Sequence, residues 1–79
     1  MLFSHLLTTV LDLPSHYTNL SNEDLKDMEI FEQLCIDLDT IAEFLSMYEA
    51  YLIKNSPHTF KQVCKAKFLL KDAWLRARY

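Results

Sequence analysis

The chain has no glycine among its 79 residues, and this absence limits its possible folds more than any motif does. Glycine reaches positive φ without steric cost, and the tight turns of hairpin-rich β folds favour such backbone. Phosphate-binding loops, dinucleotide-binding fingerprints and glycine-flanked nucleophile elbows are excluded too, because each needs backbone that a Cβ would block. A helical architecture is therefore favoured.

Hydrophobic periodicity predicts three helices, separated by the only two prolines of the chain. The first covers residues 2–13, where apolar residues recur at three- and four-residue spacing along one stripe. Pro14 biases Leu13 away from helical backbone and so ends this helix. We expect residues 14–20 to form a polar link.

The second helix is predicted over residues 22–54. Ser21 is a suitable N-cap, with Asp24 in the place of a capping-box acid. Apolar residues then recur every seven positions in three columns, a pattern typical of a helical bundle. The columns are Phe31, Leu38, Leu45 and Leu52; Met28, Cys35 and Ala42; and Leu34, Ile41 and Tyr48. A break at Asp39–Thr40 is the main alternative, because a second capping-box pattern begins there. The uninterrupted stripe favours continuity.

The third helix is predicted over residues 57–78. Asn55 tolerates the left-handed conformation that ends helices, Ser56 can cap the next helix, and Pro57 suits its first position. So short a connection usually joins antiparallel neighbours. We therefore predict one all-α domain over residues 1–79, a three-helix unit built on a long antiparallel helical hairpin, with a homodimer left open. The apolar residues of the third helix form two strips, Val63, Leu70, Trp74 and Ala77, and Phe60, Cys64, Phe68 and Leu75.

Charge is divided unevenly along the chain. Residues 1–53 contain ten acidic residues and one basic residue, a net charge of −9. Residues 54–79 contain seven basic residues and one acidic residue, a net charge of +6. Pairing of opposite charges within the hairpin is the simplest interpretation, although exposed pairs stabilise by only about 0–1 kcal/mol each. The expected pairs are Glu32 with Arg78, Asp39 with Lys71, and Glu43 with Lys67.

Residues able to carry chemistry are few and scattered. The histidines and cysteines do not occur at the spacing of a metal site, and we interpret the histidines as surface residues. Cys35 and Cys64 fall on apolar helical faces and are expected to be reduced core thiols, most simply in the cytoplasm. We predict no cofactor, no metal, no small-molecule substrate and no enzymatic activity. The apolar N-terminal stretch is too short to cross a bilayer.

Hydrophobic residues make up 51% of the chain, whereas a domain of this size buries only about 60–65% of its surface. A partner that covers apolar surface is therefore expected. We predict a small acidic protein–protein interaction module that binds and modulates, most simply inhibits, a partner protein. Inhibitors, adaptors, immunity proteins and phage host-takeover proteins are of this type. A DNA-binding regulator that uses the basic C-terminal helix, or a structural homodimer, is the alternative.

Two regions are candidates for partner contact. The acidic stretch of residues 23–32 can address a basic protein surface. A second apolar strip through Phe44 and Tyr51 is either an interface or a surface covered by the first helix. The predicted partner-binding residues are Glu23, Asp27, Ile30, Phe44, Met47, Tyr51, Lys67, Lys71, Trp74 and Arg78.

Overall fold

The computed structural model describes residues 2–79, and the predicted all-α class is confirmed. The elements are α1 (Leu2–Asp12), the short 3₁₀ helix η1 (Leu13–His16), α2 (Asn22–Leu25), α3 (Met28–Asn55) and α4 (Pro57–Arg78). The molecule measures 40 × 20 × 18 Å along its principal axes. Among residues 2–79, no helix combines the length and the apolar character needed to span a membrane.

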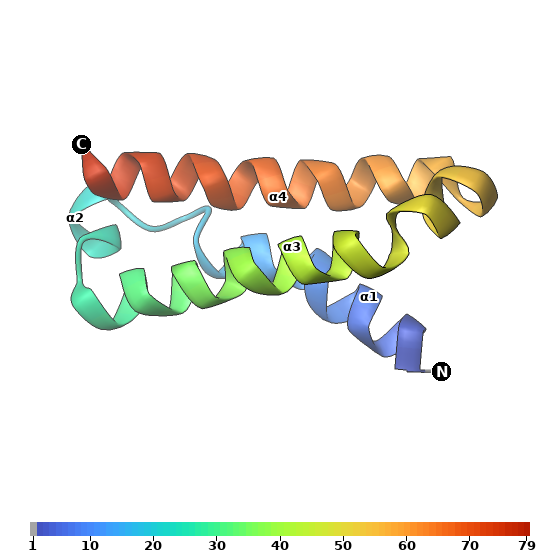
Figure 1. Cartoon of the computed structure of the whole chain (residues 1–79). Coiled ribbons are helices and arrows are strands. Elements are labelled where there is room, and N and C mark those ends of the chain that lie inside the picture. Colours follow the sequence, from blue (N-terminus) through green and yellow to red (C-terminus); the bar gives the residue numbers. More distant parts are fainter. Residues whose placement is uncertain (1) are drawn as a thin grey trace.

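The two long helices, α3 and α4, lie side by side and run in opposite directions (Figure 1). They are joined through Ser56 alone. α1 lies against both of them and crosses them at an angle, while the segment between α1 and α2 returns along α4. The N-terminal third of the chain therefore covers one side of the α3–α4 pair.

The helix expected over residues 22–54 is interrupted near its start, and α3 begins only at Met28. The reason is a second N-cap that the prediction overlooked. The side chain of Asp27, whose backbone is extended, accepts hydrogen bonds from the backbone N–H groups of Glu29 and Ile30 at 3.0 and 3.3 Å. Ser21 caps only the four residues of α2, through a bond from the Asp24 N–H. Two caps so close together produce two helices.

From Met28 onward α3 is continuous through Asp39 and Thr40. The hydroxyl of Thr40 donates to the carbonyl oxygen of Ile36 at 3.0 Å, one turn back in the same helix. That hydroxyl is therefore satisfied inside the helix, where a capping role would have required it to accept from a following N–H.

The turn between α3 and α4 forms without left-handed backbone. Asn55 is still helical, and no residue of the described chain has positive φ. Ser56 takes φ −151° and ψ 68°, and its N–H donates to the Leu52 carbonyl at 2.7 Å. Ser56 does stand at the predicted N-cap position of α4, but its side chain makes no capping hydrogen bond. The predicted left-handed role of Asn55 is wrong. Pro57 does occupy the first turn of α4, where its missing N–H costs nothing.

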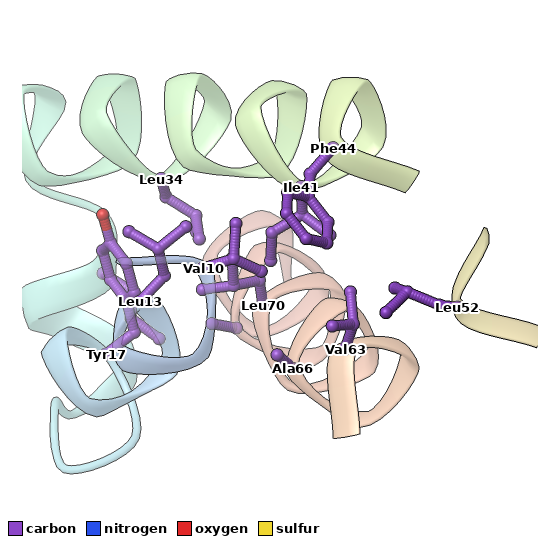
Figure 2. Packing of buried hydrophobic residues seen from close by; sticks show 12 residues of the cluster. Val10, Leu13, Tyr17, Leu34, Ile41, Phe44, Leu52, Val63, Ala66 and Leu70 are labelled. Atoms are coloured by element: carbon purple, nitrogen blue, oxygen red, sulfur yellow. The ribbon is translucent and has the colours of Figure 1, made fainter. Parts of the chain in front are cut away.

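The hydrophobic core lies where α1, α3 and α4 meet. Figure 2 shows Val10 of α1 next to Leu34 and Ile41 of α3 and Leu70 of α4. The link after α1 also contributes, because Leu13, Pro14 and Tyr17 are all buried. The expectation of a polar link over residues 14–20 is therefore wrong for Pro14 and Tyr17, which lie in and directly after the 3₁₀ helix. The buried apolar residues are Val10, Leu13, Tyr17, Leu25, Leu34, Ile41, Phe44, Leu52, Val63, Ala66, Leu70 and Ala73.

The predicted ion pairs between the second and third helices do not form. Within residues 2–79 the one salt bridge joins Asp72 and Arg76, both in α4, at 3.4 Å. The contact between α3 and α4 is instead apolar, with buried residues of each helix facing the other. The acidic side chains of α3 and the basic side chains of α4 therefore do not form salt bridges with one another.

Candidate functional site

The side of α4 that faces away from the core carries large apolar side chains. The core side is formed by Val63, Ala66, Leu70 and Ala73. The opposite side carries Cys64, Phe68 and Leu75, at a spacing of four and seven residues that places them on one stripe. The Phe68 side chain is 70% exposed and that of Leu75 is 42% exposed. The prediction that Cys64 is a core thiol is therefore wrong, since it lies on this exposed stripe.

Basic residues flank this stripe on α4. Lys61, Lys65, Lys67 and Lys71 are all exposed, and none of them belongs to the one salt bridge of the described chain. We call the stripe together with these lysines the outer face of α4. Three of its members, Phe68, Lys71 and Leu75, line a hollow of about 200 Å³ together with Asp72. The outer face is thus apolar along its centre and positively charged at its edges.

Four of the predicted partner-binding residues lie along one edge of this outer face. Lys67, Lys71, Trp74 and Arg78 follow one another at intervals of four, three and four residues, so they share one side of α4. Trp74 is half-buried and stacks on Phe31 of α3, with 6.5 Å between ring centroids. The Arg78 guanidinium carbon lies 4.7 Å from the centre of the Trp74 ring, a cation–π arrangement.

The predicted strip on α3 is largely covered by α1. Phe44 is buried, and the ring of Phe3 stacks on it with centroids 5.8 Å apart. Phe3 also meets Tyr48 and Tyr51 edge to face, at 4.8 and 5.6 Å. The prediction that Phe44 contacts a partner is therefore wrong, because the first helix packs over it. Met47 is 67% exposed and Tyr51 is 55% exposed, so both remain accessible at the border of the contact between α1 and α3.

The predicted acidic residues lie on different elements from the residues above. Glu23 is exposed in α2, and the Asp27 side chain is engaged as the N-cap of α3. Ile30 is half-buried in the first turn of α3. The structure therefore places the ten predicted residues on three segments: one side of α4, the part of α3 beside α1, and the junction of α2 with α3.

A buried polar contact lies at the start of α3, and it was not predicted. The Tyr17 hydroxyl donates a hydrogen bond of 2.5 Å to Oδ2 of Asp37, which is only 7% exposed. The second carboxylate oxygen of Asp37 accepts from the Gln33 side-chain amide at 3.0 Å. Figure 2 shows the Tyr17 ring standing in the core with its oxygen directed toward α3.

This environment keeps the Tyr17 hydroxyl protonated. Burial raises the pKa of Tyr17 well above its ordinary value, and the hydrogen bond to Asp37 and the negative charge of that carboxylate raise the pKa further. The hydroxyl therefore acts as a hydrogen-bond donor at neutral pH. It is not available as a base.

An open hollow of about 540 Å³ lies beside this contact. We call it the Asp37 hollow. Its walls include Leu13 and Leu20 from the link and Ile30 from α3, while Asp37 and Glu29 supply carboxylates. The complete lining is Leu13, His16, Tyr17, Leu20, Glu29, Ile30, Gln33 and Asp37. The hollow therefore combines apolar walls with two acidic groups and contains no lysine or arginine in its lining.

Arg76 fixes the link that forms one wall of this hollow. Its Nη1 donates to the Leu20 carbonyl oxygen at 3.3 Å and to Oδ1 of Asn22 at 3.2 Å. Its Nε lies 3.4 Å from Asp72. Arg76 is therefore a structural residue that connects α4 to the segment before α2. Its charge is already engaged.

One sequence signal could have located the buried carboxylate. Ile30, Asp37, Phe44 and Tyr51 are spaced by seven residues, so an acid stands in an otherwise apolar column of α3. An acid in such a column requires a buried donor, which the link supplies through Tyr17. The sequence signal for the outer face of α4 is the second apolar strip of this helix, which contains Phe68 and Leu75, but spacing alone does not tell which of the two strips is buried.

Within residues 2–79, no three His, Cys, Asp or Glu side chains gather closely enough to hold a metal ion. No family model matches the chain, and comparisons with curated proteins and with solved structures found no significant match. The function is therefore argued from the outer face of α4 and the Asp37 hollow alone.

Proposed function

We propose that this chain is a non-enzymatic protein–protein interaction module that binds an acidic partner protein through the outer face of α4. Modulation of the partner, as by an inhibitor or adaptor, follows if the docked helix covers a working surface. The observation that carries the proposal is the exposure of Phe68, 70% of whose side chain faces solvent between lysines. Burying a phenylalanine of this kind is worth about 1.5–3 kcal/mol.

The charge on this face selects the partner's chemistry. The lysines of α4 are not neutralised by α3, so an approaching surface meets an apolar strip with positive edges. An acidic amphipathic segment complements both features, because its apolar side covers Phe68 and Leu75 while its carboxylates reach the lysines. Such complementarity raises the association rate and sets the orientation of the complex.

Two alternatives meet physical objections on the same face. A homodimer formed by two outer faces would bring lysines opposite lysines, an unfavourable arrangement. A DNA-binding helix is favoured by the row of exposed lysines, but the apolar stripe along its centre would face phosphates, and residues 1–53 carry −9. We further propose a reducing compartment such as the cytoplasm, where Cys64 on this face stays a thiol.

The test places a photo-crosslinking amino acid at position 68 of the full chain, in the cells that produce it. Position 50 is the matched control, because Ala50 is also exposed and lies on α3. We expect one discrete protein adduct from position 68 and none from position 50. The double variant Lys67→Glu/Lys71→Glu should lose that adduct, whereas Lys54→Glu, at the end of α3, should keep it.

Three results would overturn this function. A nuclease-sensitive adduct would assign the helix to DNA, and binding of purified protein to duplex DNA that weakens steeply with salt would say the same. An adduct of two copies of the chain would indicate a homodimer. Equal adducts from both positions, or none, would remove the outer face as a docking surface.

A further inference from the structure

We propose that the Asp37 hollow binds an organic cation, an ammonium or guanidinium group carried on a short apolar chain. This site lies at the start of α3 and is independent of the docking function proposed for α4. Its volume of about 540 Å³ falls in the range of small-molecule sites, about 300–1,000 Å³. Three features of the hollow select the ligand: an uncompensated carboxylate, free acceptor positions and apolar walls.

The carboxylate of Asp37 lacks a positive partner. Within residues 2–79, no lysine, arginine or histidine nitrogen lies within 4.0 Å of it. Arg76 lies at the Leu20 side of the hollow, but its guanidinium is engaged by hydrogen bonds to Leu20 and Asn22 and by a salt bridge to Asp72. A carboxylate that is 93% buried without a counter-charge is costly, and a bound cation would compensate it.

The same carboxylate can accept more hydrogen bonds than it receives. An ionised carboxylate offers about four acceptor positions, and Asp37 accepts one bond from Tyr17 and one from Gln33. Because Tyr17 remains a donor and Gln33 contributes an amide, the open acceptor positions suit a ligand that donates N–H groups. A guanidinium has five such donors in one plane.

The remaining lining defines the rest of the ligand. Leu13, Leu20 and Ile30 form apolar walls that suit a short alkyl or aryl chain. Glu29 is exposed at the same hollow and adds a second negative charge. The other titratable groups in the lining are His16 and Tyr17. An anion would be repelled by both carboxylates. A neutral ligand would leave Asp37 uncompensated.

The experiment titrates the full ¹⁵N-labelled chain with n-butylguanidinium, and in parallel with n-butylurea, its uncharged isostere. Amide chemical shifts report binding and its location. We expect saturable shifts confined to residues 13–21 and 28–38 with n-butylguanidinium. Binding of n-butylurea should be at least about tenfold weaker, because its hydrogen bonds to Asp37 lack the contribution of a positive charge.

Three single variants locate the charge requirement. Asp37→Asn should weaken n-butylguanidinium binding by about tenfold or more. The fold can accommodate this change, because the Gln33 side-chain amide can rotate so that its oxygen accepts a hydrogen bond from the new Asn amide. Glu29→Gln, at an exposed position, should weaken binding by roughly two- to fivefold, as for a partly screened pair. Glu49→Gln removes one negative charge from an exposed position of α3 outside the hollow and should leave binding unchanged.

Equal binding of n-butylguanidinium and n-butylurea would overturn the proposal. Equal losses of binding in Glu29→Gln and Glu49→Gln would also overturn it, because they would indicate a general attraction of the acidic chain for cations. Shifts spread over α4 would do the same. If Asp37→Asn does not fold, the probe pair and the Glu29→Gln comparison still decide. The variant Lys67→Glu/Lys71→Glu should bind n-butylguanidinium normally, so failure of one proposal leaves the other standing.

Discussion

The N-terminal segment contacts α3 in two chemically different ways. Just past the middle of α3 the contact is aromatic, with Phe3 on Phe44. Near its beginning the contact is polar, with Tyr17 donating to the buried carboxylate of Asp37. The aromatic contact is governed by volume and area, so similar side chains can replace one another. The polar contact is governed by partners, because each buried group depends on the other.

Phe44→Ala should break the aromatic contact and have the largest effect. Truncating a buried phenylalanine leaves a cavity and costs about 3–5 kcal/mol, a large part of the stability of a domain this small. Urea denaturation followed by circular dichroism measures the loss. Phe44→Leu is the control and should cost less than about 1.5 kcal/mol if only volume matters. A similar cost for both variants would mean that ring stacking dominates.

Tyr17→Phe should break the polar contact at a smaller cost. The variant keeps the ring and removes one hydroxyl, which leaves Oδ2 of Asp37 buried without a donor and costs about 1–3 kcal/mol. The same denaturation experiment applies. In the double variant Tyr17→Phe/Asp37→Leu the cost should be below the sum of the two single changes, because neither partner is then left unsatisfied. Additive costs would contradict the coupling.

The two contacts should also differ in their response to alkaline pH. The pKa of Tyr17 is raised by folding, so its stabilising contribution is complete below the unfolded value of about 10 and is lost as pH rises beyond it. We expect the free energy of unfolding to fall above pH 10 by up to about 1.4 kcal/mol per pH unit through this group. Tyr17→Phe should fall less steeply than the native chain, and an identical slope would refute the assignment.

The smallest expected effect concerns the residue that starts α3 beside the polar contact. Asp27→Ala removes the N-cap and should cost about 1 kcal/mol, measured as a shift in the urea midpoint. Because Gln33 lies soon after this cap, amide exchange should quicken first between residues 28 and 37, while the aromatic contact stays protected. Ser21→Ala is the control, and it should affect exchange in α2 alone.

Sequence reasoning reached the helical class because glycine is absent and the apolar spacing is strong. It failed at Asp27, since an acid in the middle of an apolar pattern resembles a solvated helix residue until its side chain is found on two backbone N–H groups. It left open whether Phe44 is covered, and it did not decide which apolar strip of the third helix is buried, one of which carries Phe68. Both aromatic residues have helical spacing, and only the position of α1 decides that one is covered and the other exposed.

The Asp37 hollow escaped prediction for a different reason. Its lining comes from the link and from α3, two separate elements, and the link was expected to be polar. The burial of Tyr17 depends on the 3₁₀ turn that follows α1. Periodicity describes one element at a time, so it does not report a site assembled from two.

The turn at Ser56, like every other described residue, uses only negative φ. Replacing a glycine by a residue with a Cβ, where the native backbone allows it, stabilises a protein by about 0.4–1 kcal/mol, because the unfolded chain then has fewer conformations. A chain whose connections never need left-handed backbone gains this advantage at every turn. Part of the stability of so small a domain therefore comes from a restricted denatured ensemble. A glycine introduced at position 56 should reduce that stability, although the Ser56 side chain makes no capping hydrogen bond that the change would remove.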